Sequence, residues 1–521
     1  MNNRRQISVF KIGGAILTGL LLTASFPDMG RSYIAWFALV PLMGAIREGS
    51  PLAAFRLGLL GGMVHYLSLI YWIIPCLRNY GMLPLYLSVA ILLLFSAYLS
   101  LFIAGFAAIL NWTCRSVKML LFAAPVIWVA CEYIRANLFT GFPWELFGYS
   151  QFRITPLIQF ADILGVYGVS WLLVLGNCSI LCLVLALRKS NWHKSPLTRN
   201  KVLTAWACFI LVLASFWGYG VRRLETIEAQ AAKAPLKRVA VIQGNIPQEK
   251  KWDTAFQLAT VDRYLDMSRR EAAADPELIV WPETALPFYF GHNAPLTNRV
   301  FRGIAATGAD YIVSSPSFIR QGDTVAYRNR AFMVSSREGR ITGIYDKAHL
   351  VPFGEYVPLK AWLPFLGKLV AQVGDFTPGE QGIALEWENH RIGMLICYEL
   401  IFPYLSREST RNGANLLVSI TNDAWYGKTS APYQHFSMGV FRAVENRRTL
   451  ARSANTGISG FIEPTGKISA TTPIFEEAAL TGTVPLMQIS TLYTRFGDWF
   501  SLACVILSFA MMIFRIFRQK N

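Results

Sequence analysis

The sequence predicts a bundle of about eight membrane-spanning helices joined to a separate external domain of mixed α/β structure. Two observations predict the bundle. Of the 521 residues, 53% are hydrophobic and only 16% are charged, and the mean hydropathy of +0.36 is too high for an ordinary soluble protein. A third observation predicts the α/β domain, because between Arg222 and about Leu486 the long apolar runs give way to short strand-like runs and polar helical stretches. The expected division is therefore residues 1–221 with about seven spans, residues 222–494 as the external domain, and residues 495–521 as a final span with a short tail.

Eight apolar runs carry the membrane prediction. Several reach the roughly 20 residues that a helix needs to cross about 30 Å of hydrocarbon. The first two have only 16 and 15 residues and could form one re-entrant hairpin instead of two spans, and Gly61-Gly62 in the third is expected to be a helix-packing feature. The runs are Ile12–Pro27, Ser32–Ile46, Leu57–Leu77, Leu83–Trp112, Met119–Thr140, Ile163–Leu187, Val202–Val221 and Trp499–Phe514.

Lys and Arg are distributed unevenly over the connections between these runs. On alternate connections, one side collects 15 Lys and Arg residues, whereas the short loops of the other side hold only Arg31, Arg78, Arg135 and Arg153. This asymmetry predicts that both termini lie in the cytoplasm and that residues 222–494 lie outside it. It also disfavours nucleic-acid binding, because the basic excess flanks apolar runs instead of lying on the folded external domain.

Seven of the eight cysteines lie in or beside the apolar runs, and Cys397 is the only cysteine of the external domain. A single cysteine cannot form an internal disulfide, so Cys397 is either a reactive thiol or a buried core residue. Its neighbours have to decide between these readings.

The external domain is expected to be a layered α/β structure with a mixed sheet. The expected strands are Arg238–Gln243, Leu278–Pro282, Tyr311–Ser315, Arg330–Ser335, Thr342–Tyr345, Arg391–Cys397, Ala414–Ile420 and Gly460–Glu463. The expected helices are Trp252–Ala273, Thr297–Ala306, Pro403–Asn412 and Tyr433–Ser453.

Three polar residues follow expected strands, where chemistry collects in such sheets. Glu283 comes after a strand that should stop at Pro282, Lys347 comes shortly after Tyr345, and Cys397 lies at a strand-to-helix corner where a helix N-terminus would stabilise a thiolate. A carboxylate can take a thiol proton, and an ammonium can stabilise the oxyanion of an attacked carbonyl. Glu283, Lys347 and Cys397 therefore form a complete set for acyl transfer, and Glu355 could hold the lysine charged and in place.

Three sequence motifs carry a resemblance to a known family. Trp281-Pro282-Glu283, the run from Tyr345 to Glu355 and Cys397-Tyr398-Glu399 resemble the motifs of the nitrilase superfamily. Within it, the chain most resembles the apolipoprotein N-acyltransferase family, over nearly its whole length and including Gly141-Phe142-Pro143-Trp144 after the fifth span.

The resemblance implies an αββα sandwich, with Cys397 as nucleophile, Glu283 as base, Lys347 as oxyanion stabiliser and Glu355, Tyr398 and Glu399 in support. It implies a phospholipid acyl donor, a diacylated apolipoprotein acceptor, and a monomer in the bacterial cytoplasmic (inner) membrane with its catalytic domain on the periplasmic face. The loops around Trp252 and Trp425 resemble active-site loops of the family, although their aromatics could also be core or interface residues.

Some residues keep two readings. Glu132 and Arg135 lie three residues apart in the fifth run, so this charged pair either grips a lipid headgroup or is structural. His349, His390 and His435 are expected to be structural, because no cysteine-protease pattern surrounds Cys397. No metal-ligand spacing occurs in the external domain, so neither a metal nor another cofactor is expected.

Two rival functions remain open from the sequence. A membrane-anchored amidase or nitrilase would share the three residues but would need only one anchor for a soluble substrate. A transporter or receptor that only binds with its external domain would not need the glutamate, lysine and cysteine together.

Overall fold

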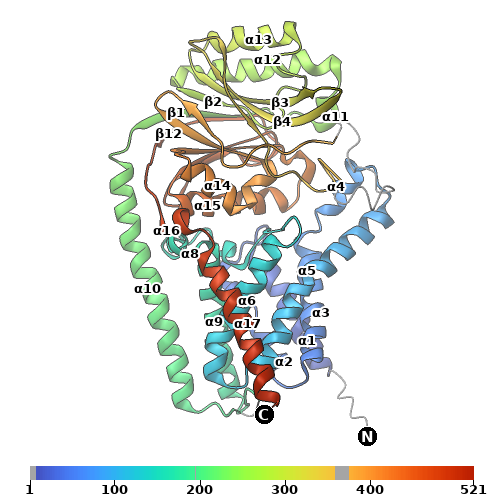
Figure 1. Cartoon of the computed structure of the whole chain (residues 1–521), viewed down its shortest axis with the longest axis vertical. Helices are drawn as coiled ribbons and strands as arrows, with labels where there is room; N and C mark the ends of the chain where they lie inside the picture. The colour runs from blue at the N-terminus through green and yellow to red at the C-terminus, as the bar shows by residue number, and fades with distance from the viewer. Residues whose placement is uncertain (1–7, 194, 358–374, 521) are drawn as a thin grey trace. The chain divides into compact units, whose positions relative to one another are not determined.

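The computed structural model describes residues 8–193, 195–357 and 375–520 (Figure 1). The chain forms two compact units: unit 1 comprises residues 1–74, 84–223 and 498–521, and unit 2 comprises residues 75–83 and 224–497. These divisions lie within three residues of the expected limits at 221/222 and 494/495, except that Pro75–Leu83 from the membrane region joins unit 2. The expected functional domains stay a prediction.

Unit 1 is helical. Among the described residues, six helices are long and apolar enough to cross a membrane, and they correspond to the third through eighth apolar runs. They are α3 (Pro51–Leu69), α5 (Leu85–Thr113), α6 (Val117–Asn137), α9 (Val166–Leu187), α10 (Arg199–Ala231) and α17 (Trp499–Lys520). The first two runs form shorter elements, α1 (Val9–Ala24) and the pair η1 (Ser32–Trp36) and α2 (Val40–Ile46), and the loops carry α4 (Ile73–Asn79), η2 (Phe147–Gln151), α7 (Thr155–Ile158) and α8 (Ala161–Leu164).

Small residues bring α3 and α5 close together. A Cβ atom on Gly62 would lie 2.8 Å from the Cβ of Ser100, and one on Gly58 would lie 2.8 Å from the Cα of Ala104. Larger side chains at these positions would push the helices apart, which is why small residues are common where membrane helices meet. The packing role expected for Gly61-Gly62 is confirmed, since a Cβ on Gly61 would lie 2.9 Å from the carbonyl oxygen of Ala15.

Unit 2 contains two six-stranded sheets. One has the strand order β12-β1-β2-β3-β4-β5 and the other has the order β11-β10-β9-β8-β7-β6. The strands of the first sheet are β1 (Leu236–Gln243), β2 (Leu278–Val280), β3 (Asp310–Gln321), β4 (Thr324–Ser335), β5 (Arg340–Asp346) and β12 (Ala478–Pro485). Those of the second are β6 (Ala384–Trp387), β7 (His390–Ile396), β8 (Leu416–Thr421), β9 (Thr449–Ala454), β10 (Gly460–Ile462) and β11 (Ile468–Thr471).

Alternation along the strands produces the layers. In β1, Val239 and Val241 belong to the core between the two sheets, together with Met394 of β7 and Val418 of β8. The intervening Ala240 and Ile242 face a second core, which includes residues of α12 (Thr254–Glu271) and α13 (Ala294–Ala305). Helices α14 (Pro403–Arg411) and α15 (Ala431–Asn446) lie on the other sheet (Figure 1). The result is the four-layer αββα arrangement that the resemblance implies.

The structure corrects one expected element and adds others. The helix expected over Tyr433–Ser453 is wrong in its last third, because α15 ends at Asn446, Arg447 takes the left-handed conformation with φ 53°, and β9 follows. Strands β6, β11 and β12 were not expected from the sequence. Short elements complete the unit: α11 (Gln248–Lys251), η3 (Ala272–Ala274), η4 (Cys397–Ile401), η5 (Asp423–Tyr426) and α16 (Leu492–Phe496).

Candidate active site

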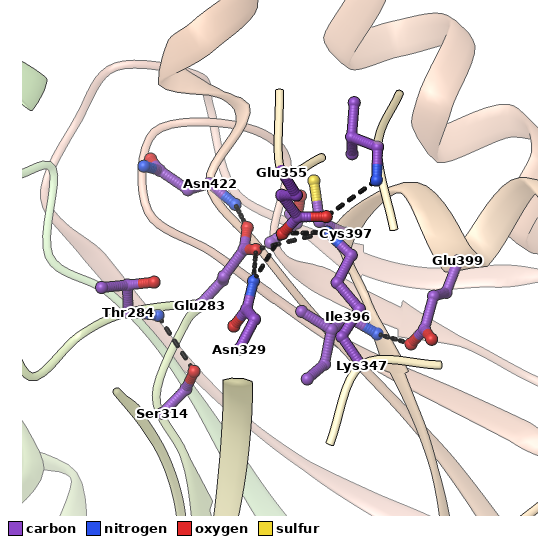
Figure 2. Close-up of polar contacts among 12 residues, drawn as sticks. Glu283, Thr284, Ser314, Asn329, Lys347, Glu355, Ile396, Cys397, Glu399 and Asn422 are labelled. Atoms are coloured by element: carbon purple, nitrogen blue, oxygen red, sulfur yellow. Dashed lines mark hydrogen bonds and ion pairs between the residues drawn. The ribbon is translucent and has the colours of Figure 1, made fainter. Parts of the chain in front are cut away.

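Both sheets supply residues to one buried cluster at their strand ends. Glu283 follows β2, Lys347 directly follows β5, and Cys397 directly follows β7. All three are buried, at 6%, 1% and 7% exposure. Figure 2 shows their side chains converging although they lie up to 114 residues apart in sequence.

The lysine lies between two carboxylates. Its Nζ is 2.9 Å from Oε1 of Glu355 and 3.8 Å from Oε1 of Glu283. The amide of Asn329, in β4, donates to both carboxylates, at 2.8 Å to Glu283 and 3.0 Å to Glu355. Asn329 therefore fixes the spacing of two carboxylates that share one lysine.

Glu283 is held on both carboxylate oxygens. The backbone N–H of Asn422 donates to Oε2 at 3.0 Å, opposite the Asn329 contact on Oε1. The backbone carbonyl of Glu283 accepts a 3.0 Å hydrogen bond from Nζ of Lys251, a buried lysine at the end of α11. Both oxygens of the Glu283 carboxylate therefore accept from donors that fix its orientation.

Cys397 has an unusual backbone conformation. Its φ is +54°, in the left-handed region that a residue with a Cβ atom seldom adopts. Its carbonyl oxygen lies 3.1 Å from Nε2 of His435. Such strained positions occur at functional sites, where the surrounding structure holds them in place.

The electrostatics of the cluster define the resting protonation states. Burial raises the pKa of the Cys397 thiol well above its usual value, Glu283 raises it further, and Lys347 offsets only part of the rise. For Lys347, burial acts to lower the pKa, but Glu355 and Glu283 outweigh it and hold the pKa above its usual value. The resting pair is therefore a neutral thiol and a charged ammonium. The helix N-terminus expected at Cys397 is one five-residue 3-10 turn, η4, and burial of the thiol outweighs any stabilisation of a thiolate by it.

The chain is similar to known proteins over nearly its whole length. Residues 18–179 match the family model of the apolipoprotein N-acyltransferase N-terminal domain, and residues 238–493 match the carbon-nitrogen hydrolase model. A relative from Geobacter metallireducens, named apolipoprotein N-acyltransferase, is 45% identical over 509 residues, which cover 97% of this chain and 95% of the relative. The chain belongs to the apolipoprotein N-acyltransferase family. The resemblance carried by the three motifs is thus confirmed.

Another relative of the same name, from Methylococcus capsulatus, is 34% identical over 93% of this chain and 92% of its own length. Among solved structures, an amidase from Nesterenkonia sp. is 21% identical to this chain. The match covers 48% of this chain and 91% of the amidase, with a TM-score of 0.37. The match of both regions and the full-length relatives place the whole chain, and not the hydrolase-like unit alone, in the apolipoprotein N-acyltransferase family.

In this family member, Glu399 links the end of β7, beside Cys397, to the loop that begins at Lys347. Its carboxylate accepts hydrogen bonds from the backbone N–H groups of Ile396 at 2.7 Å, Ala348 at 2.6 Å and His349 at 3.0 Å, and from the Tyr345 hydroxyl at 3.0 Å. Burial raises the pKa of Glu399 to about 7, while these backbone N–H groups pull it down. One carboxylate thus joins the residue before Cys397 to the two residues after Lys347.

Replacing Glu399 by glutamine should destabilise the protein. A glutamine amide has only one acceptor oxygen, so its NH₂ group would face backbone donors and leave at least one unpaired. We expect a loss of about 2 kcal/mol or more in the free energy of unfolding, together with most of the activity, measured by thermal unfolding in detergent. Glu386→Gln, a change at an exposed glutamate of the same unit, is the matched control. An unchanged melting temperature for Glu399→Gln would contradict this role.

A second buried network contacts the backbone carbonyl of Cys397 through His435. Nδ1 of His435 lies 3.1 Å from Oδ1 of Asp423 and 3.0 Å from Nη2 of Arg452, which also contacts Asp423 at 2.8 Å. Burial and the Arg452 charge lower the pKa of His435. With its proton on Nε2, the neutral imidazole donates to the Cys397 carbonyl and accepts from Arg452 at Nδ1, whereas its approach to the Asp423 carboxylate then brings two acceptors together.

The structure places the other expected residues as follows. The ring of Tyr398 lies 5.1 Å from that of Phe402 and 5.8 Å from that of His349, whose Nδ1 is 2.8 Å from the Tyr404 hydroxyl. Trp252 directly follows Lys251, and Trp425 lies three residues after Asn422, so both flank residues that hold Glu283. His390 begins β7 and lies at the opposite end of this strand from Cys397.

Two further observations concern residues outside the cluster. The ring of Trp425 packs against Tyr80 at 4.9 Å, and the Tyr80 hydroxyl donates to the Ala424 carbonyl at 2.9 Å, which anchors Pro75–Leu83 to unit 2. In unit 1, Arg135 donates to the Trp144 carbonyl at 2.9 Å and Glu132 accepts from the Phe147 N–H at 2.6 Å. These two charges therefore hold the loop after α6, and a lipid contact for Arg135 stays a prediction.

Sequence reasoning missed Asn329, Lys251 and the His435 network. A signal existed for Asn329, because an asparagine inside a strand-like run is an unusual choice unless its amide is used. Within the described residues, no group of three or more His, Cys, Asp or Glu side chains is arranged to hold a metal ion.

Proposed function

We propose that this protein transfers a fatty acyl chain from a membrane phospholipid, through a thioester on Cys397, to the free α-amino group of a diacylglyceryl-modified cysteine at the N-terminus of an apolipoprotein. The observation that carries the proposal is the convergence of Glu283, Lys347 and Cys397 within a single buried cluster, with the lysine between two carboxylates. The names of the full-length relatives support the same activity.

The first half-reaction forms the thioester. Glu283 takes the thiol proton as Cys397 sulfur attacks the ester carbonyl, and Lys347 stabilises the negative charge that develops on the carbonyl oxygen. Collapse of this intermediate breaks the ester C–O bond, and the leaving alkoxide recovers the proton from Glu283. The products are a lysophospholipid and an acylated Cys397.

The second half-reaction forms the amide. The acceptor amine attacks the thioester carbonyl, Lys347 again stabilises the oxyanion, and Glu283 takes the amine proton. The Cys397 sulfur then leaves and is reprotonated, which regenerates the enzyme. An amide is more stable than a thioester, so this step is thermodynamically favourable.

Membrane-held substrates fit the remaining architecture. Basic residues on alternate connections support a multi-pass protein of the bacterial cytoplasmic (inner) membrane with both termini cytoplasmic. Residues 222–494 would then form a periplasmic catalytic domain, working as a monomer beside membrane-held donor and acceptor. Tethering both substrates and enzyme to one surface raises their effective concentration. We assign Trp252 and Trp425 to substrate contacts, because both flank residues that hold Glu283.

The experiment that tests the proposal separates the two half-reactions. With phospholipid alone, intact mass spectrometry should show one acyl chain on Cys397, with release of about one equivalent of lysophospholipid, because no amine is present to discharge it. Adding a diacylated lipopeptide with a free amine should discharge the acyl group as an amide with ping-pong kinetics.

Two controls sharpen this test. An N-acetylated lipopeptide should leave the acyl-enzyme intact, and Glu283→Gln should prevent its formation. Continuous release of free fatty acid without any amine would refute the transferase and favour the amidase-like hydrolase. A protein that binds phospholipid without acylation of Cys397 would favour the receptor alternative.

A further inference from the structure

Unit 2 has a groove of about 650 Å³ that contains four arginines. Arg391, Arg411, Arg448 and Arg495 line it, together with polar residues such as Asn415 and Gln488, and no carboxylate lines it. Among the described residues, the one carboxylate within 4.0 Å of these four guanidinium groups is that of Glu386, which is exposed and 3.7 Å from Arg391. The groove therefore has a strong unbalanced positive charge.

The groove lies at the opposite end of the strands from the candidate active site. Arg391 is the second residue of β7, Asn415 precedes β8 and Arg448 precedes β9, and these three strands are parallel. Cys397 and Asn422 follow the other ends of β7 and β8. Arg391 and Cys397 are six positions apart along β7, so roughly 20 Å lies between the two sites at about 3.3 Å per residue.

Arg448 is a buried arginine that backbone carbonyls hold in the lining of the groove. Only 3% of this residue is exposed, and it donates to the carbonyls of Ala414, Asn446, Arg447 and Ile489 through Nε and Nη1. Within the described parts of the chain, its Nη2 makes no hydrogen bond. Burial lowers the pKa of Arg448 to about 10, so the guanidinium stays charged near neutral pH. A buried charge that has carbonyl partners but no carboxylate is stabilised by an anion.

Chain length points to the source of that anion. Arg495 lies four residues before Trp499, where the apolar helix α17 begins. Four residues span at most about 14 Å, so the chain itself limits the separation of Arg495 and Trp499 to that distance. Clusters of basic residues beside such helices attract anionic lipids.

We propose that the groove formed by Arg391, Arg411, Arg448 and Arg495 binds the phosphate of an anionic membrane phospholipid, at a site separate from the one that supplies the acyl chain. Guanidinium groups bind phosphate oxygens in pairs, and a volume of this size accommodates a glycerophosphate headgroup. The bound lipid would hold the end of unit 2 that leads into α17.

The test uses the full chain in detergent after its lipid has been removed. Phosphatidylglycerol is titrated in, and native mass spectrometry measures how much lipid the protein binds. Arg448→Gln could prevent folding, so the test variant is the triple change Arg391→Gln, Arg411→Gln and Arg495→Gln. The matched control is Arg269→Gln, Arg270→Gln and Arg340→Gln, which removes the same charge from exposed arginines elsewhere in unit 2. We expect the groove variant to bind phosphatidylglycerol about tenfold more weakly or worse, and the control to bind as the parent does.

Several results would overturn the proposal. Equal losses in both variants would mean that binding depends on net charge only. Equal binding of phosphatidylcholine by the parent would remove the preference for an anionic lipid. Displacement of the lipid by millimolar inorganic phosphate as readily as by dihexanoyl phosphatidylglycerol would identify a free-phosphate site instead. The readout needs no turnover, so it stands or falls independently of acyl transfer.

Discussion

Changing Cys397 to serine should reduce acyl transfer by roughly 10⁴-fold or more while leaving the protein folded. Serine is close to cysteine in size, so it can occupy the same buried position. Burial and Glu283 already raise the pKa of the thiol, and an alcohol is far harder to deprotonate than a thiol in the same place. Glu283 would no longer be a strong enough base for the first step.

This expectation is measured as lysophospholipid release and as acyl mass on the intact protein. Cys208→Ser, at an exposed cysteine of α10, is the matched control and should keep parental activity. If Cys397→Ser retained more than about a tenth of the parental rate, Cys397 would be excluded as the nucleophile. An unchanged melting temperature separates loss of chemistry from loss of fold.

Changing Lys347 to arginine should impair activity nearly as much as changing it to methionine, by about 10²-fold to 10³-fold or more. The ammonium is 1% exposed and sits between Glu355 at 2.9 Å and Glu283 at 3.8 Å. A planar guanidinium carries the same charge but is larger and directs its N–H groups in a fixed fork. It would displace one carboxylate or point away from the carbonyl oxygen.

The two substitutions should differ in stability even though they agree in activity. Lys347→Met leaves two carboxylates near each other without the cation between them, so it should lower the melting temperature more than Lys347→Arg does. Lys467→Arg, at an exposed lysine of unit 2, is the matched control and should change neither quantity. Recovery of most of the activity in Lys347→Arg would mean that charge alone, and not geometry at the oxyanion, is what the lysine supplies.

The sequence could predict which three residues meet in the buried cluster because of their positions along the chain. Glu283 and Cys397 each follow a run of buried strand residues, and Lys347 follows β5, whose residues alternate between exposed and half-buried up to the buried Tyr345. Strand ends of both kinds can be found from periodicity and from Pro282. Helices α5, α6 and α9 could be predicted within about three residues, because an apolar run of that length has few alternatives in a membrane.

The parts that could not be predicted depend on tertiary contacts. Strand β9 contains Arg452 and Ser453, and such polar residues do not suggest a buried strand. They are buried because Arg452 pairs with Asp423 and Ser453 donates to the Ile242 carbonyl, 211 residues away. Asn329 likewise acquires its role only when β4 brings its amide to Glu283 and Glu355. No local pattern contains partners that lie so far apart.

The strand order of the first sheet has a consequence for biosynthesis. The first strand of unit 2, β1, pairs along its whole length with the last one, β12, so that Leu236 lies opposite Pro485 and Gln243 opposite Ala478. That edge of the sheet cannot form until about 240 further residues have left the ribosome, which takes roughly 12 to 50 s at 5 to 20 residues per second. During this interval one side of β1 lacks its partner strand and is open to wrong pairing. Completion of the sheet would therefore nearly coincide with synthesis of α17, which begins 14 residues after Pro485. Nascent chains that stop before Ala478 should be cleared by proteases, and those that extend past Pro485 should resist them.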